Sequence, residues 1–113
     1  MGLPGAERAV IEPAKLRDYL LSSTHPIGRF KAPLFQALGY TAKGWGVLHT
    51  DLLDVARTHQ AVKSKPNAYG EKYEVRATLQ GPNGRTAKIV TVWIVRTNED
   101  YPRLVTAYPD QLR

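Results

Sequence analysis

The sequence has no cysteine, so it can form neither a disulfide nor a thiolate metal site. It also has no apolar run near the roughly 20 residues that span a membrane. Its first residues, MGLPGAERAVIEP, lack the pattern of a secretory signal. With 113 residues, we expect one domain over residues 1–113, with its core at about 6–108, that acts in the cytoplasm without a membrane partner.

Metal and nucleotide motifs are missing as well. His25, His49 and His59 stand in no metal-binding spacing, and Asp51 and Asp54 read as ordinary solvated surface. No glycine-rich loop joins a strand to a helix in the way that phosphate-binding motifs require. We therefore expect no metal and no cofactor.

Acidic residues are scarce relative to basic ones. Ten Asp and Glu face sixteen Lys and Arg, which gives a formal charge of +6. A small basic domain favours a polyanion such as nucleic acid as its partner, and an acidic protein fits equally well.

The first half of the chain has helical signals. Pro13 suits a helix start, and the spacing of Leu16, Tyr19 and Leu20 predicts an apolar helix face. A second helix is expected from about residue 29 to a Gly39 cap, with Pro33 in its first turn. A third is expected over residues 41–57.

The second half has strand signals. Alternation and β-branched residues predict strands over 60–65, 72–80, 85–96 and 103–108, with a hairpin turn at GPNG. A short apolar piece at 9–11 precedes the helices. The predicted fold class is α+β, with N-terminal helices on one face of a four-stranded antiparallel sheet in the order βαααββββ.

The segment SSTHPIGRFK carries the strongest chemical signal. His25, Arg29 and Lys31 lie within seven residues that lead into a helix start, where free backbone N–H groups favour phosphate. A histidine beside two cations suits metal-free RNA cleavage, in which one group removes the 2′-hydroxyl proton and cations stabilise the phosphorane. The alternative is a loop turn with solvated cations.

The strands offer a second wall for such a site. Thr91 and Trp93 share one face of their strand, and Thr106 and Tyr108 share one face of the next. Their hydroxyls and rings suit orienting a phosphate and stacking a base, or else they are β-formers that pack under the helices.

Three cations of the second half are further candidates. Arg85 and Lys88 follow the hairpin turn and can widen a basic surface. Arg103 lies at a strand end and either faces the same cleft or pairs with Glu99 or Asp100.

Two long stretches, AVIEPAKLRDYLLSSTHPIGRFKAPLFQALGY and GRTAKIVTVWIVRTNEDYPRLVTAY, closely resemble a bacterial family of small uncharacterised domains. The motifs are HPxGxxKAxxFxALG and TxWIV…PRLVTAY. Members of that family resemble parts of toxin–antitoxin and polymorphic-toxin systems. The architecture is also similar to the ribonuclease toxins that include barnase, EndoU, colicin-type tRNases and RelE.

The resemblance implies a metal-independent endoribonuclease toxin that cuts mRNA or tRNA and is neutralised by a small acidic antitoxin or immunity protein encoded nearby. His25 and Lys31 carry over from the HP-G–KA motif, with His25 as acid or base. The other roles are then assigned as follows: Lys31 and Arg29 hold the phosphate, Thr91 and Tyr108 orient it or the 2′-hydroxyl, Arg103 supports the transition state, and Arg85, Lys88, Trp93 and Thr106 bind RNA.

Two other functions remain open. One is a non-catalytic basic adaptor or antitoxin-type module that binds nucleic acid or an acidic protein. The other is transfer of a group to RNA or protein. The RNA target and the oligomeric state do not follow from the sequence.

Overall fold

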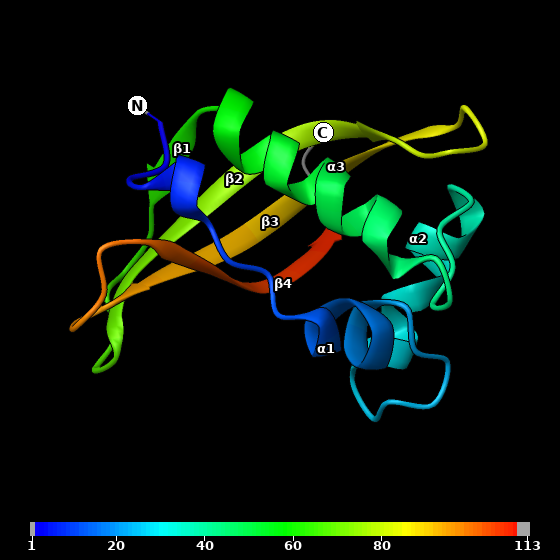
Figure 1. Ribbon diagram of the computed structural model, residues 1–113, viewed down its shortest axis with the longest axis horizontal. Coiled ribbons are helices and arrows are strands. Elements are labelled where there is room, and N and C mark those ends of the chain that lie inside the picture. Colours follow the sequence, from blue (N-terminus) through cyan, green and yellow to red (C-terminus); the bar gives the residue numbers. More distant parts are fainter. Residues whose placement is uncertain (1, 111–113) are drawn as a thin grey trace.

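The computed structural model describes residues 2–110 and has an α+β fold, with helices packed on one face of a sheet (Figure 1). The strands are β1 (Ala61–Lys63), β2 (Gly70–Gln80), β3 (Thr86–Arg96) and β4 (Pro102–Pro109). They lie in chain order, each antiparallel to the next. The predicted fold class and the four-stranded meander are confirmed.

Residue alternation explains strand β2. Tyr73, Val75, Ala77 and Leu79 are buried and face the helices, whereas Arg76, Thr78 and Gln80 are exposed on the other face. The turn to β3 is the predicted GPNG, where Gly84 has a φ of 86°, a left-handed value that favours glycine. The Gly81 N–H donates to the Arg85 carbonyl across this turn.

Helix α3 (Trp45–Thr58) packs on one face of the sheet (Figure 1). Its apolar stripe, Leu48, Leu52, Val55 and Ala56, is buried. The helix starts later than the predicted residue 41 because the backbone at Gly44 is not helical, and the Thr41 hydroxyl instead accepts a hydrogen bond from the Gly44 N–H at 3.0 Å.

The N-terminal helices are shorter and less regular than the helical spacing of apolar residues predicts. Turn η1 (Ala6–Arg8) comes first, α1 (Pro13–Lys15) continues into a π-helix, η2 (Leu16–Leu20), and η3 (Gly28–Phe30) precedes α2 (Ala32–Ala37). Pro33 lies in the first turn of α2, as predicted.

The apolar piece at 9–11 is a single bridge rather than a strand. Val10 pairs in parallel with Arg103, donating to the Pro102 carbonyl and accepting from the Leu104 N–H. The helix that starts at Pro13 leaves no room for a longer pairing. This bridge ties the N-terminal segment to β4.

A β-bulge determines which way β4 presents its side chains. Along β3, Val92 pairs with Thr106, but the next residue, Trp93, pairs with Leu104, so Val105 is an extra residue on β4. Leu104 therefore faces the helices with Trp93, whereas Thr106 and Tyr108 turn to the opposite face. We call that opposite side the open face of the sheet.

The core lies between α3, the N-terminal helices and the sheet, with Leu16, Phe35, Leu52 and Trp93 fully buried. Within residues 2–110, no helix has the length and apolarity needed to cross a membrane.

Candidate functional site

Five side chains from separate parts of the chain meet on the open face at β4. The Lys31 Nζ donates to the Thr106 Oγ1 at 3.0 Å, and the Tyr19 hydroxyl is hydrogen-bonded to the same oxygen at 3.1 Å. The Lys31 Nζ also lies 5.9 Å from the centre of the Tyr108 ring. His25 packs edge-on against Tyr19, with 4.9 Å between the ring centres. We call Tyr19, His25, Lys31, Thr106 and Tyr108 the Lys31 cluster.

Local structure holds these groups in place. Thr106 and Tyr108 reach the open face because of the bulge at Val105. Lys31 is the residue before the first turn of α2. Gly28 packs so closely on η2 that a Cβ there would overlap the Tyr19 carbonyl oxygen, which makes glycine necessary for this contact.

The backbone of its own loop fixes the tautomer of His25. The N–H groups of Ile27 and Gly28 both donate to the His25 Nδ1, each at 3.0 Å. A ring nitrogen that accepts hydrogen bonds carries no proton, so the ring proton lies on Nε2. In this geometry His25 offers a neutral donor, not a free base.

The Tyr19 phenol has an altered acidity. Partial burial acts to raise its pKa, but hydrogen bonds with Thr106 and Lys31 and the positive charges of Lys31 and Lys15 outweigh burial and lower the pKa. Tyr108 differs, because burial and the charges of Glu74 and Asp110 raise its pKa against the opposing effect of Arg76. Tyr19 is therefore the phenol of the cluster that gives up its proton more easily.

A cavity of about 550 Å³ opens beside the cluster. Tyr19, His25 and Thr106 line it, together with Lys15 and Asp18. The cavity gives a ligand access to the phenol and the imidazole.

Comparisons with known proteins place the chain in a family. Residues 2–111 match the sequence model of a family described as a domain of unknown function, DUF6883. The chain belongs to this family. No match was found among curated protein sequences.

A solved structure shares the fold. It is described as a contact-dependent growth inhibition toxin–immunity protein complex from Klebsiella pneumoniae 342. One chain of it is 23% identical, with a TM-score of 0.69, and the match covers 89% of this chain and 99% of that one. At this identity the likeness shows a common fold.

Two predicted residues of this DUF6883 domain lie elsewhere. Thr91 is fully buried, donates to the Val75 carbonyl at 3.0 Å and accepts from the Trp93 indole N–H at 2.8 Å. Trp93 is also fully buried in the core. The expectation that both line one cleft with Thr106 and Tyr108 is corrected, because the bulge sends the two pairs to opposite faces of the sheet.

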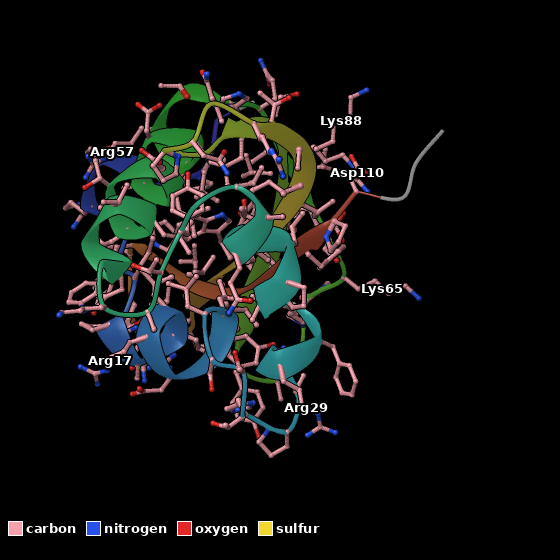
Figure 2. All side chains as sticks on the ribbon, turned by 90° about the vertical axis from the view of Figure 1, so that its right-hand side faces the viewer. Arg17, Arg29, Arg57, Lys65, Lys88 and Asp110 are labelled. Carbon is pink, nitrogen blue, oxygen red and sulfur yellow. The ribbon has the colours of Figure 1, made fainter. Side chains whose placement is uncertain are left out.

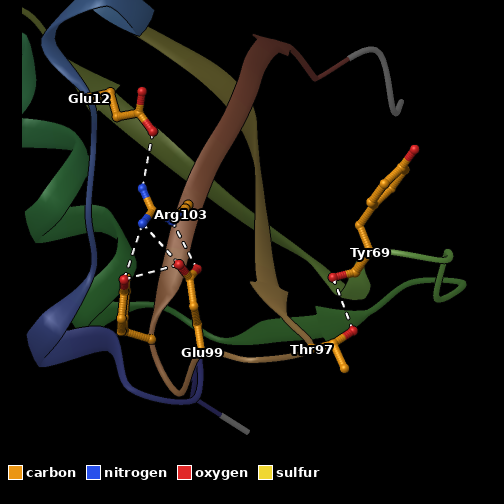
Figure 3. A network of polar contacts seen from close by, with 6 residues as sticks. Glu12, Tyr69, Thr97, Glu99 and Arg103 are labelled. Carbon is orange, nitrogen blue, oxygen red and sulfur yellow. Dashed lines mark hydrogen bonds and ion pairs between the residues drawn. The ribbon is translucent and has the colours of Figure 1, made fainter.

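Arg103 forms ion pairs with acidic side chains, and one of them, Glu99, is a partner that the alternative interpretation named. Its guanidinium donates to both carboxylate oxygens of Glu99 at 2.9 Å and to Glu12 at 3.0 Å (Figure 3). The hydrogen bonds and charge of Glu99, with help from the Tyr101 hydroxyl, raise the pKa of Arg103 despite desolvation. The arrangement braces the N-terminal segment against the turn between β3 and β4.

The remaining predicted cations are exposed and scattered. Arg29 lies at the tip of the N-terminal helical region, 4.5 Å from the centre of the Phe30 ring, on the other side of the molecule from Lys88 (Figure 2). Arg85 is exposed just after the hairpin turn. The Arg29 backbone N–H donates to the His25 carbonyl at 3.1 Å, but the residue itself is exposed.

Sequence reasoning missed Tyr19 and Lys15. The spacing of Leu16, Tyr19 and Leu20 predicts an apolar helix face, and the Tyr19 hydroxyl is the one sequence signal of a further role. Within residues 2–110, no group of three or more acidic or histidine side chains is placed to hold a metal ion.

Proposed function

We propose that this chain is a metal-independent endoribonuclease toxin that cleaves mRNA or tRNA. The observation that carries the proposal is the meeting of a lysine, a phenol of lowered pKa and a histidine N–H donor beside an open cavity. Such a set supplies positive charge, a proton acceptor and a hydrogen-bond donor without a metal.

The reaction is attack of a ribose 2′-oxygen on the adjacent phosphorus, with cleavage of the bond to the 5′-oxygen. Tyr19, in its phenolate form, takes the 2′-hydroxyl proton. Lys31 stabilises the charge of the phosphorane, and the His25 Nε2–H donates to one of its oxygens. Lys15, which lines the same cavity, returns a proton to the 5′-oxygen. The products carry a 2′,3′-cyclic phosphate and a 5′-hydroxyl.

Thr106 and Tyr108 act as positioning residues in this scheme. The Thr106 hydroxyl joins Lys31 to Tyr19, and the Tyr108 ring limits where the ammonium lies. The buried Thr91 and Trp93 act only through the core beneath them.

The proposed partner is a small acidic antitoxin or immunity protein. The formal charge of +6 favours an acidic partner, and the structurally similar chain comes from a toxin–immunity protein complex. A substrate such as mRNA or tRNA places the action in the cytoplasm.

The direct test is incubation of the purified protein with total RNA, together with growth after induction. We expect RNA fragments with 2′,3′-cyclic phosphate ends and arrested growth. Lys31→Met keeps the aliphatic stem and should lower the cleavage rate by about 10²- to 10³-fold. His49→Asn, on the far side in α3, is the matched control and should leave the rate unchanged. Intact RNA and normal growth with the wild-type chain would contradict the proposal.

Two substitutions separate the loop role of His25 from its chemical role. In His25→Asn the side-chain oxygen replaces Nδ1 as acceptor for the Ile27 and Gly28 amides, but the Nε2–H donor is lost. In His25→Gln the side-chain amide replaces Nε2, but the loop acceptor is lost. We expect the Asn variant to fold like the wild type and cleave about 10²-fold more slowly. Equal rates for His25→Asn and the wild type would exclude a chemical role.

A non-catalytic role is the second candidate, because the complex that contains the similar chain holds both a toxin and its immunity protein. As a basic adaptor or immunity-type module, the chain would bind RNA or an acidic protein in a salt-dependent way without cleaving it. Removal of any one of several cations would then weaken binding to a similar extent.

A further inference from the structure

A second cavity lies next to the cavity beside the Lys31 cluster. It measures about 780 Å³ and lies over the ends of β3 and β4. Both cavities are lined by Glu12, Lys15 and Val105. The two cavities therefore adjoin each other, and we call the second one the Tyr69 groove.

The cations that line the Tyr69 groove outnumber its acidic side chains. Its acidic side chains, Glu12 and Glu99, are both hydrogen-bonded to Arg103 (Figure 3). Lys15 and Arg96 also line the groove, and neither is among the ion pairs of the described residues. The balance of three cations against two carboxylates favours an anionic ligand such as a phosphodiester.

An aromatic ring stands at the edge of the groove on a fixed backbone. Tyr69 is 75% exposed. Its carbonyl accepts from the Thr97 hydroxyl at 3.3 Å (Figure 3). The same carbonyl accepts from the Thr97 N–H at 3.0 Å, and the Tyr69 N–H donates to the Asn67 side chain at 2.7 Å. The ring itself makes none of these bonds. A large apolar ring held in solvent in this way is suited to stacking a planar ligand.

We propose that the Tyr69 groove binds an unpaired nucleotide next to the scissile phosphate, with its base stacked on Tyr69 and its phosphate beside Arg96. Ile94 and Val105 form the apolar floor under the sugar and base. Stacking on a ring requires a base that is free of a duplex, so the substrate class is single-stranded RNA. The inference rests on the proposed ribonuclease function, because it extends that substrate beyond the cluster.

The test uses a fluorescently labelled single-stranded 2′-O-methyl oligoribonucleotide, which has no free 2′-hydroxyl and cannot be cleaved. A second oligonucleotide has the same backbone with abasic positions. Binding is measured by fluorescence anisotropy over a range of salt concentrations. Tyr69→Ala should bind the base-bearing strand about 5- to 150-fold more weakly and leave the abasic strand unaffected. Tyr69→Phe should bind both strands like the wild type.

Charge variants complete the design. Arg96→Ala should weaken binding of both strands and reduce the salt slope by about 0.7. Lys43→Ala, an exposed cation that does not line the groove, controls for net charge. Thermal melting should be unchanged by Tyr69→Ala, because the backbone of Tyr69, not its ring, makes the local hydrogen bonds.

The outcomes separate the groove from the catalytic proposal. If Tyr69→Ala and the wild type bind the base-bearing strand with equal affinity, the proposed nucleotide binding in the groove is wrong, whether or not RNA is cleaved. A wild-type chain that binds neither strand contradicts the proposed nucleotide binding as well. Tyr69-dependent binding of the base-bearing strand by a chain that leaves RNA intact supports the groove and overturns the ribonuclease function.

Discussion

Three tyrosines of this chain carry the same phenol in different surroundings. Tyr40 is buried, and its hydroxyl donates to an Asp51 carboxylate oxygen at 2.6 Å, so burial, that bond and the carboxylate charge raise its pKa. Tyr108 on the open face is shifted in the same direction. For Tyr19 the net effect is reversed by Thr106, Lys31 and Lys15. Acidity at this site is thus set by neighbouring residues.

The pKa of Tyr19 can be tested by absorbance titration of tyrosinate. The difference between the wild type and Tyr19→Phe isolates one phenol, whose midpoint we expect below the usual value of about 10. Lys31→Met should raise that midpoint, because it removes a hydrogen bond and a charge that favour the phenolate. If the phenolate is the base, kcat/KM rises with pH as the Tyr19 phenol loses its proton. A midpoint above the usual value would exclude this role.

At the scale of elements, two local irregularities build the candidate site. The bulge at Val105 turns Thr106 and Tyr108 to the open face, although unbroken alternation would have left them on the side of Leu104. The close packing of the 25–31 loop on η2 brings His25 to Tyr19. Neither irregularity changes the order of the elements, so both alter the site without altering the fold.

The contact of Gly28 with η2 can be tested by Gly28→Ala. A Cβ would overlap the Tyr19 carbonyl and push the loop outward. We expect a loss of about 1–3 kcal/mol in unfolding free energy and a lower cleavage rate as His25 moves from Tyr19. Gly46→Ala in α3 is the matched control, because a Cβ there meets nothing within 4 Å. It should be neutral or stabilising by up to about 1 kcal/mol. A Gly28→Ala variant as stable and active as the wild type would show that the loop adapts freely.

At the scale of the whole molecule, pattern and periodicity predict the architecture well. Alternation in β2 and the β-branched run in β3 predict the meander because each depends only on neighbouring residues and a buried face. The faces taken by Thr91 and Thr106 depend on the register between two strands and on one extra residue, which no single strand's pattern contains. Tyr19 and His25 meet through tertiary packing, so spacing along the chain could not join them.

Arg103 joins the N-terminal segment, β4 and the turn before β4, and this role is tested by Arg103→Met. The variant loses the bonds to Glu12 and Glu99 together, so its melting temperature should fall at neutral pH. Arg8→Met, which breaks only the exposed pair with Asp100, should change the melting temperature little.

The stabilisation by Arg103 depends on pH. Arg103 lowers the pKa of Glu99 in the folded state, so this stabilisation is present above the usual pKa of a glutamate and is lost as the pH falls through the lowered value. The melting difference between wild type and Arg103→Met should therefore shrink in acid. A variant that melts like the wild type but cleaves RNA far more slowly would instead place Arg103 in the reaction.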